Sequence, residues 1–169
     1  MLSRVAARDP PQRKPPASPE AVAIRLLARR DYGRAELRSR LASRGVAGDE
    51  IDRVLDKLER AGYLSDARFA SALVAQKAGQ YGKRAIAHAL KEKRVAPDAA
   101  EEALRALGPV DELADATALW RRRFGVPPRD EREKARHVRF LLARGYAMSV
   151  ALKVLRRAGA SVDDDGVRD

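Results

Sequence analysis

The sequence contains no cysteine, few aromatic residues and no long hydrophobic run. Without cysteine, the chain can form neither disulfides nor thiolate metal sites, and thiol catalysis is excluded. No window approaches the roughly 18 apolar residues that span a bilayer, and the N-terminus lacks the apolar core of a signal peptide. Aromatic residues make up only 5% of the chain, and the apolar content is mainly Ala, Leu and Val. We therefore expect a cytoplasmic protein with no membrane segment, built from thin helical modules.

The sequence also lacks a convergent set of catalytic groups. Neither histidine, His88 or His137, has a second metal ligand at the H-E-x-x-H spacing. The pair Gly82-Lys83 lacks the first glycine and the hydroxyl residue of a phosphate-binding P-loop. We therefore predict that the protein is not an enzyme and that it uses no metal or cofactor.

Positive charge is abundant and unevenly distributed. The chain of 169 residues has 35 Lys and Arg against 24 Asp and Glu, a formal charge of +11 and a pI near 10.5. Residues 108–159 hold twelve basic and six acidic residues, whereas 21–60 hold ten and seven, and 61–107 hold eight and five. This balance favours an anionic or filamentous partner, and it makes the last third of the chain the most cationic.

One apolar pattern occurs three times along the chain. An offset of 49 residues aligns the first copy with the second, and a further offset of 51 aligns the second with the third. Aligned triplets include Leu41, Leu90 and Leu141, then Val54, Ala103 and Val154, then Leu55, Leu104 and Leu155. A repeat with this period indicates an array of similar helical modules, which usually presents a long surface to an extended partner.

Start and stop signals place three helices in each repeat. Ser18-Pro19 begins a helix predicted over 19–30, and Leu37 with Leu41 marks a second over 34–44 that stops at Gly45. Further helix starts are predicted at Asp49-Glu50, Ser65-Asp66, Gly82 and Pro97-Asp98. Asp130 and Glu133 are spaced as a capping box at the start of another helix. Two more helices are predicted along Leu113–Trp120 and Val150–Leu155.

The sequence therefore predicts an all-α fold, an elongated and curved array of three tandem three-helix repeats with nine helices. The expected domains are a disordered basic, proline-rich tail (1–17), repeat 1 (18–61), repeat 2 (62–108), repeat 3 (109–159) and a flexible acidic tail (160–169).

Clusters of basic residues are the candidate binding groups. Most cations at helical spacing beside acids form only a solvated face, but periodic guanidinium groups match a phosphate backbone or an acidic protein groove. The predicted contacts are Arg25, Arg29, Arg30, Arg34, Arg38, Lys83, Arg84, Arg121, Arg122, Arg123, Arg132, Lys134, Arg136 and Arg139. The four tyrosines fit turn or core positions at helix junctions, so sequence-specific reading of single strands is not expected.

Residues 62–70, Gly-Tyr-Leu-Ser-Asp-Ala-Arg-Phe-Ala, resemble the G-Y-L-x-D-x-R-F-A hallmark of the RecX family of bacterial recombination regulators. Tyr81-Gly82, followed by Ile86 and Leu90, resembles the next motif of that family, and the resemblance extends over about 19–159. Two residues depart from the pattern: Lys83 stands where the family commonly has proline, and Arg94 stands where it usually has glycine.

The resemblance implies a regulator of DNA recombination, DNA repair and the SOS response that binds the RecA filament on single-stranded DNA. Such a regulator would act as a monomer in the filament groove, limiting filament growth and damping ATPase, strand exchange and co-protease activity. Motif residues such as Gly62, Leu64, Asp66, Phe69 and Gly82 are then expected to be structural, setting how one module meets the next. Two alternatives stay open, a helix-turn-helix regulator that binds duplex DNA and a scaffold that recruits an acidic protein without DNA.

Overall fold

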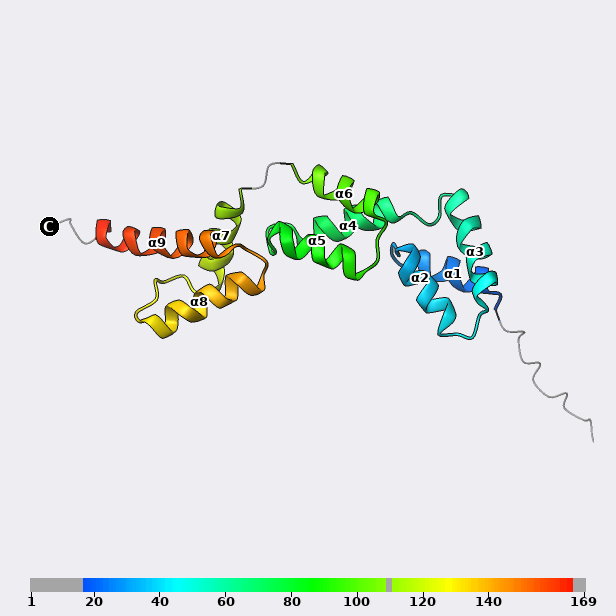
Figure 1. The fold of residues 1–169 in the computed structure, drawn as a ribbon, viewed down its shortest axis with the longest axis horizontal. Coiled ribbons are helices and arrows are strands. Elements are labelled where there is room, and N and C mark those ends of the chain that lie inside the picture. Colours follow the sequence, from blue (N-terminus) through cyan, green and yellow to red (C-terminus); the bar gives the residue numbers. More distant parts are fainter. Residues whose placement is uncertain (1–16, 109–110, 166–169) are drawn as a thin grey trace, which may run out of the picture.

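The computed structural model describes residues 17–108 and 111–165, with side chains up to residue 159, and these residues form nine helices and no strands. The predicted tail over 1–17 therefore lies almost entirely outside the described residues. The helices are α1 (Pro19–Leu27), α2 (Arg34–Ala42), α3 (Gly48–Arg60), α4 (Asp66–Lys77), α5 (Lys83–Glu92), α6 (Pro97–Ala106), α7 (Glu112–Arg123), α8 (Glu131–Ala143) and α9 (Met148–Asp165). Figure 1 shows them in an elongated row, with α1–α3 at one end and α7–α9 at the other.

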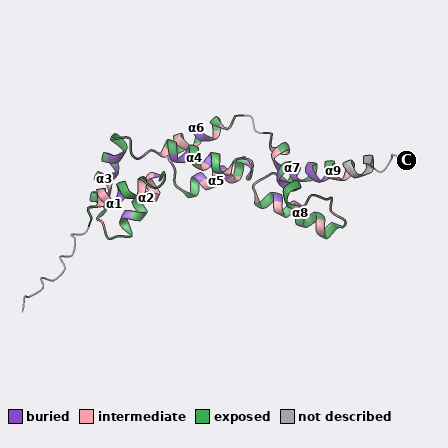
Figure 2. Cartoon of the chain, turned by 180° about the vertical axis from the view of Figure 1, so that it is seen from behind, coloured by how far each residue is buried: buried purple, intermediate pink, exposed green. Residues whose placement is uncertain are grey.

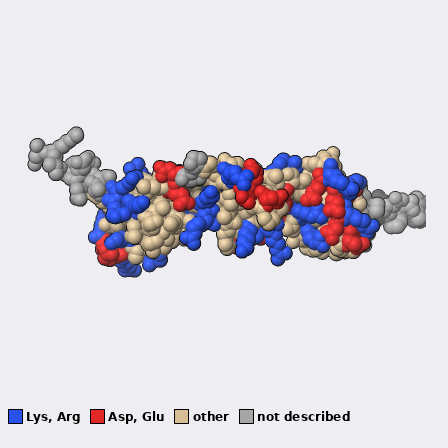
Figure 3. All heavy atoms as spheres, turned by 45° about the horizontal axis from the view of Figure 1, so that its top comes forward, with Lys and Arg blue, Asp and Glu red and all other residues tan. Residues whose placement is uncertain are grey.

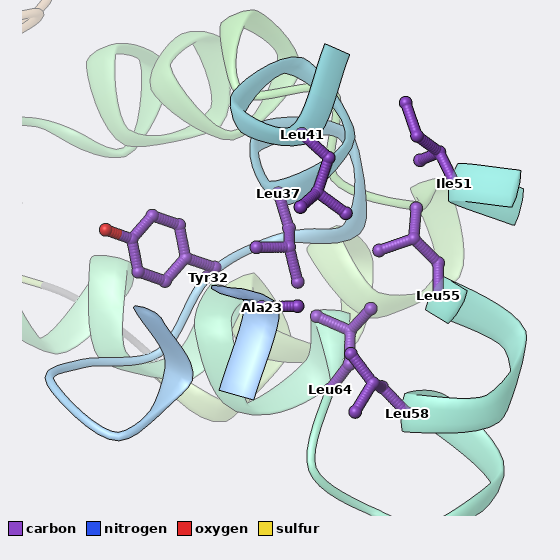
Figure 4. Close-up of a cluster of buried hydrophobic side chains, with 8 residues drawn as sticks. All are labelled: Ala23, Tyr32, Leu37, Leu41, Ile51, Leu55, Leu58 and Leu64. Carbon is purple, nitrogen blue, oxygen red and sulfur yellow. The ribbon is translucent and has the colours of Figure 1, made fainter. Parts of the chain in front are cut away.

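Each group of three helices has its own hydrophobic core. In the first module, Leu37 and Leu41 of α2 meet Leu55 and Leu58 of α3, and Leu64 from the α3–α4 connection joins them (Figure 4). The second core forms within α4–α6 and the third within α7–α9. Buried residues line the inside of each module in Figure 2, while most of the outer surface is exposed. The predicted three-module, all-α architecture is confirmed.

Most helix starts follow the predicted signals. The side chain of Ser18 accepts a hydrogen bond from the Ala21 N–H at 3.2 Å, and that of Ser65 accepts one from Arg68 at 3.2 Å. At α8, the Asp130 carboxylate accepts from the Glu133 N–H at 2.7 Å. The Glu133 carboxylate bonds the N–H of the preceding Arg129 at 3.0 Å, so the capping box is displaced by one residue from the predicted one.

Three helix ends differ from the prediction, and α2, which ends at Ala42 rather than at 44, differs by only two residues. Helix α1 stops at Leu27, three residues before the predicted end, because the chain must turn to bury Tyr32 and Gly33. Helix α9 continues to Asp165, so part of the tail expected to be flexible from residue 160 is helical. No proline interrupts this stretch, and the next glycine after Gly159 is residue 166.

The turn after the middle helix of each module needs a left-handed backbone. Gly45 and Gly145 adopt φ values of 79° and 84° at this turn. Arg94 occupies the same place in the second module with φ 52°, and it is the one non-glycine residue with positive φ in the described chain. A side chain at such a position strains the backbone, and glycine avoids that strain.

The carboxylate of Asp66 joins the first two modules, and an ion pair between Asp31 and Arg68 at 3.5 Å adds to the joint. Asp66, the first residue of α4, accepts hydrogen bonds from the backbone N–H of Arg34 at 2.7 Å and from that of Ala96 at 3.0 Å. It thereby satisfies the open N-terminus of α2, whose N-cap Gly33 offers no side chain. A Cβ on Gly33 would lie 3.0 Å from the ring of Phe69, so the two modules meet closely here.

The second joint repeats this arrangement. Glu112, the first residue of α7, accepts a hydrogen bond from the N–H of Lys83 at 3.1 Å, and Lys83 is the first residue of α5. The N–H of Gly82 donates to the carbonyl of Arg144 at 2.8 Å. A Cβ on Gly82 would lie 2.7 Å from the carbonyl oxygen of Gly145. The structural roles expected for Asp66, Phe69 and Gly82 are thus confirmed.

The middle helix of the third module carries its own side-chain cap. Helix α8 begins with the carboxylate cap Asp130, whereas α2 and α5 begin after glycines without a side-chain cap. An acid from the next module supplies the missing cap of α2 and of α5, whereas α8 is capped by an acid of its own module. No helix in the described part of the chain is long and apolar enough to cross a membrane.

Candidate functional site

Three arginines and two phenylalanines line one hollow on the third module. Arg123 and Phe124 lie at the end of α7, and Arg136, Arg139 and Phe140 lie on α8. The hollow has a volume of about 530 Å³. We call it the arginine hollow.

The two phenylalanine rings of the arginine hollow pack against each other and against His137. The ring of Phe124 stacks on that of His137 with centroids 3.7 Å apart, and it meets Phe140 edge-on at 5.3 Å. The indole N–H of Trp120 donates to Nδ1 of His137 at 3.3 Å. Burial lowers the pKa of His137, and the nearby Arg136 charge adds to this, so the ring is neutral at neutral pH and can accept this bond.

The guanidinium groups of the hollow are poorly neutralised. Arg123 and Arg139 are exposed and have no carboxylate partner among the described residues. The nearest carboxylate oxygen to Arg136 belongs to Glu133, at 3.9 Å. Converging guanidinium groups in this state bind phosphate or carboxylate well, since each can offer two parallel N–H donors.

In the first module, by contrast, predicted contacts are used internally. Arg34 lies 2.7 Å from the carboxylate of Asp56 and 2.5 Å from that of Glu59, both on α3. Arg38 pairs with Asp52, and this hydrogen bond lowers the pKa of Asp52. We call these five residues the α2–α3 ion-pair network. Their mutual neutralisation leaves Arg34 and Arg38 little charge for an external anion.

Arg30 is also engaged within its module. Its guanidinium group contacts Glu36 at 2.6 Å and lies 3.7 Å from the centroid of the Tyr32 ring. The hydrogen bond from Arg30 lowers the pKa of Glu36. Arg25 and Arg29, also on the first module, are exposed and have no such partner among the described residues.

The run Arg121–Arg123 does not act as one group, because successive helical residues point in different directions. Arg122 donates to the carbonyl of Gly79 at 3.2 Å and so belongs to the joint between the second and third modules. Arg121 is exposed and Arg123 lines the arginine hollow.

The other predicted contacts are dispersed. Lys83, Arg84 and Arg132 are exposed, and Lys134 pairs with Glu131 at 3.1 Å. On the face shown in Figure 3, basic side chains are interspersed with acidic ones, so no continuous positive strip runs along this face. Of the fourteen predicted contacts, the structure brings Arg123, Arg136 and Arg139 together.

The sequence interpretation missed Phe124 and Phe140 as parts of the site. It considered the tyrosines as the aromatic groups, whereas the hollow uses two Arg-Phe pairs, 123–124 and 139–140. This dipeptide could not have identified them, because it also occurs at Arg68-Phe69, where the phenylalanine is buried in the second core. Among the described residues, no group of three or more His, Asp or Glu side chains is placed to hold a metal ion.

Comparison with known proteins gives the family. Models of the first, second and third three-helix domains of RecX match residues 21–58, 65–104 and 110–155. The chain belongs to the RecX family. The three matched RecX domains fall on the three modules of Figure 1.

Several curated relatives carry the name Regulatory protein RecX. The RecX of Ralstonia nicotianae is 40% identical over 149 residues, covering 88% of this chain and 93% of the relative. The RecX of Leptothrix cholodnii is 41% identical over 152 residues, covering 90% and 96%. The crystal structure of RecX from Lactobacillus salivarius has the same fold, with a TM-score of 0.66 at 18% identity, over 84% of this chain and 95% of that one.

Proposed function

We propose that this chain is a non-enzymatic modulator of the RecA recombinase filament on single-stranded DNA, acting mainly to inhibit filament growth, ATPase activity and strand exchange. Membership of the RecX regulatory family supports the partner. The observation that carries the proposal is the arginine hollow, where Arg123, Arg136 and Arg139 meet without full neutralisation. It acts as a monomer in the cytoplasm and needs no cofactor.

The geometry favours phosphate contact over base stacking. Phe124 stacks on His137 and meets Phe140 edge-on, and arginine side chains lie over both rings, so these rings offer less surface to a nucleotide base than the stacking platforms of single-strand binders. The exposed guanidinium groups of Arg123 and Arg139 can reach a phosphate oxygen without such stacking. Because the modules form an elongated row, the third module can contact a phosphate while the other modules contact successive protomers of a filament.

The test compares two double variants that remove the same charge. Arg123→Gln with Arg139→Gln empties the hollow of two guanidinium groups. The control is Arg53→Gln with Arg105→Gln, because these arginines are exposed and pair with Asp49 and Glu101 on their own helices. Inhibition of the DNA-dependent ATPase of RecA is titrated with each variant, and circular dichroism confirms that each is folded.

We expect the hollow variant to need on the order of tenfold to a hundredfold more protein for half-inhibition, since two charge-assisted contacts are lost. The number of counterions released on binding to the filament, read from the slope of log K against log salt concentration, should fall by about two. The control should match the parent protein. Equal inhibition by the two variants would refute the role of the hollow.

A second arm tests the partner itself. The chain is titrated onto bare duplex DNA and onto the RecA filament across a range of salt concentrations. Sequence-preferring duplex binding with no effect on the filament ATPase would refute filament modulation and favour the helix-turn-helix alternative. Filament binding that persists when the DNA contacts are removed would favour recruitment through protein alone.

A further inference from the structure

A second hollow lies on the third module, between α9 and the connection that leads into α8. Pro127 and Pro128 form one wall, and Leu152 and Leu155 of α9 form an apolar floor. Its volume is about 560 Å³. We call it the α9 hollow.

The rim of the α9 hollow is basic. Lys134 lies on the α8 side, where it pairs with Glu131 at 3.1 Å, and Lys153 and Arg156 lie on the α9 side. Lys153 and Arg156 are exposed and have no carboxylate partner among the described residues. The side chain of Leu152 is 38% exposed, so an apolar group lies open between cations.

The internal repeat shows which residues occupy the position equivalent to the α9 hollow in the first module. With the offsets of 49 and 51, Leu152 aligns with Asp52, Arg156 with Asp56, and Lys134 with Arg34. In the first module these positions belong to the α2–α3 ion-pair network, in which the acids of α3 neutralise the arginines of α2.

In the third module one of the two middle-helix cations is kept, as Lys134, and Arg38 aligns with Val138. The facing acids Asp52, Asp56 and Glu59 are replaced by Leu152, Arg156 and Gly159. The place that carboxylates occupy in the first module is therefore open, apolar at its centre and cationic at its edges.

We propose that the α9 hollow binds an acidic, amphipathic segment of a partner protein. One or two apolar side chains of that segment pack on Leu152 and the two prolines, and its carboxylates pair with Lys153 and Arg156. This interaction goes beyond the proposed DNA contact and does not depend on it.

Segments of this chain fit the hollow poorly. Residues 1–16 carry four basic residues and one acidic residue, so the basic rim repels them. Three of the C-terminal acids, residues 163–165, are part of helix α9 itself and cannot fold back onto it while it stays helical. The acids must therefore come from another protein.

The probe is a fluorescein-labelled synthetic peptide of about 14 residues, in which Leu and Phe recur at helical spacing among Glu and Asp. One matched peptide replaces the acids with Lys, and another replaces Leu and Phe with Ala. Binding is followed by fluorescence anisotropy with the full chain. The protein variant is Leu152→Asp, which places a carboxylate where the first module has Asp52 and so should fold.

The matched control is Leu142→Asp. The side chain of Leu142 is 37% exposed, close to that of Leu152, but it lies on α8 outside the hollow. Both variants change the net charge equally, so a general charge effect would affect them alike.

We expect the acidic amphipathic peptide to bind at least about tenfold more tightly than either matched peptide. Leu152→Asp should weaken this binding at least about tenfold, and Leu142→Asp should change it less than about twofold. Equal binding by the two variants, or by the alanine peptide, would overturn the proposal. So would equal loss in the Arg123→Gln/Arg139→Gln variant, because the peptide would then sense only overall charge.

Discussion

Removal of the Asp66 carboxylate should weaken the joint between the first two modules. In Asp66→Ala, the N–H groups of Arg34 and Ala96 lose their acceptor, and both bonds are partly shielded from water. An unsatisfied, shielded donor costs about 1–3 kcal/mol, and water can replace part of each bond. We therefore expect the free energy of unfolding to fall by about 2–4 kcal/mol.

The matched control is Asp98→Ala. Asp98 is also an acid in the first turn of its helix, α6, but it is exposed and bonds no other module. Its loss should cost less than about 1 kcal/mol, the usual contribution of an acid near a helix N-terminus.

The assay is urea unfolding followed by two signals. Far-ultraviolet circular dichroism reports the helices of all three modules, whereas the single tryptophan, Trp120, lies in the third core. Because the three cores are separate, Asp66→Ala should lower the dichroism midpoint more than the fluorescence midpoint. If Asp66→Ala were no more destabilising than Asp98→Ala, the carboxylate would not be the joint that we describe.

Three further predictions concern backbone strain, the second joint and pH. Arg94→Gly should raise the free energy of unfolding by about 0.5–1 kcal/mol, because relief of left-handed strain exceeds the entropy that glycine adds to the unfolded chain; a lower urea midpoint would contradict this. Gly45→Ala should cost about 1–2 kcal/mol from strain alone, since nothing lies within 4 Å of its added Cβ. Gly145→Ala should cost clearly more, because its Cβ would lie 2.8 Å from the nitrogen of Ala85, and equal midpoints for the two variants would argue against a close second joint. Burial lowers the pKa of His137, so its contribution to stability is present above about pH 6.5 and is lost as the pH falls, because the unfolded chain binds the proton first. Tryptophan-monitored urea unfolding from pH 8 to 5 should show this loss, and His137→Gln should reduce it.

Much of the fold could be predicted because its signals are local. Ser18 and Ser65 cap the helices that follow them, and Gly45 and Gly145 end the helices that precede them, as the sequence indicates. The apolar repeat places the residues of each core on one helical face, so the three modules follow from spacing alone. Arg94 stands where the other two modules have glycine, and it adopts the same left-handed backbone.

The site was predicted only in part. Arg123, Arg136 and Arg139 were among the predicted contacts, but so were Arg34 and Arg38, which the acids of α3 neutralise. Charge alone does not distinguish these groups, because each pairing depends on which helix faces which across the module.

The sequence by itself determined the nine helices, their grouping into three modules and the concentration of positive charge in the third. The helices depend on residues within about one or two helical turns of one another, the modules on the repeat and the charge on local composition, so none of them requires knowledge of which helix faces which. Only the tertiary structure decided which N–H groups Asp66 accepts from at the joint, that the arginines of α2 are neutralised and that two Arg-Phe pairs converge on one hollow. These contacts form between segments separated along the chain, and electrostatic interactions depend on distance in space.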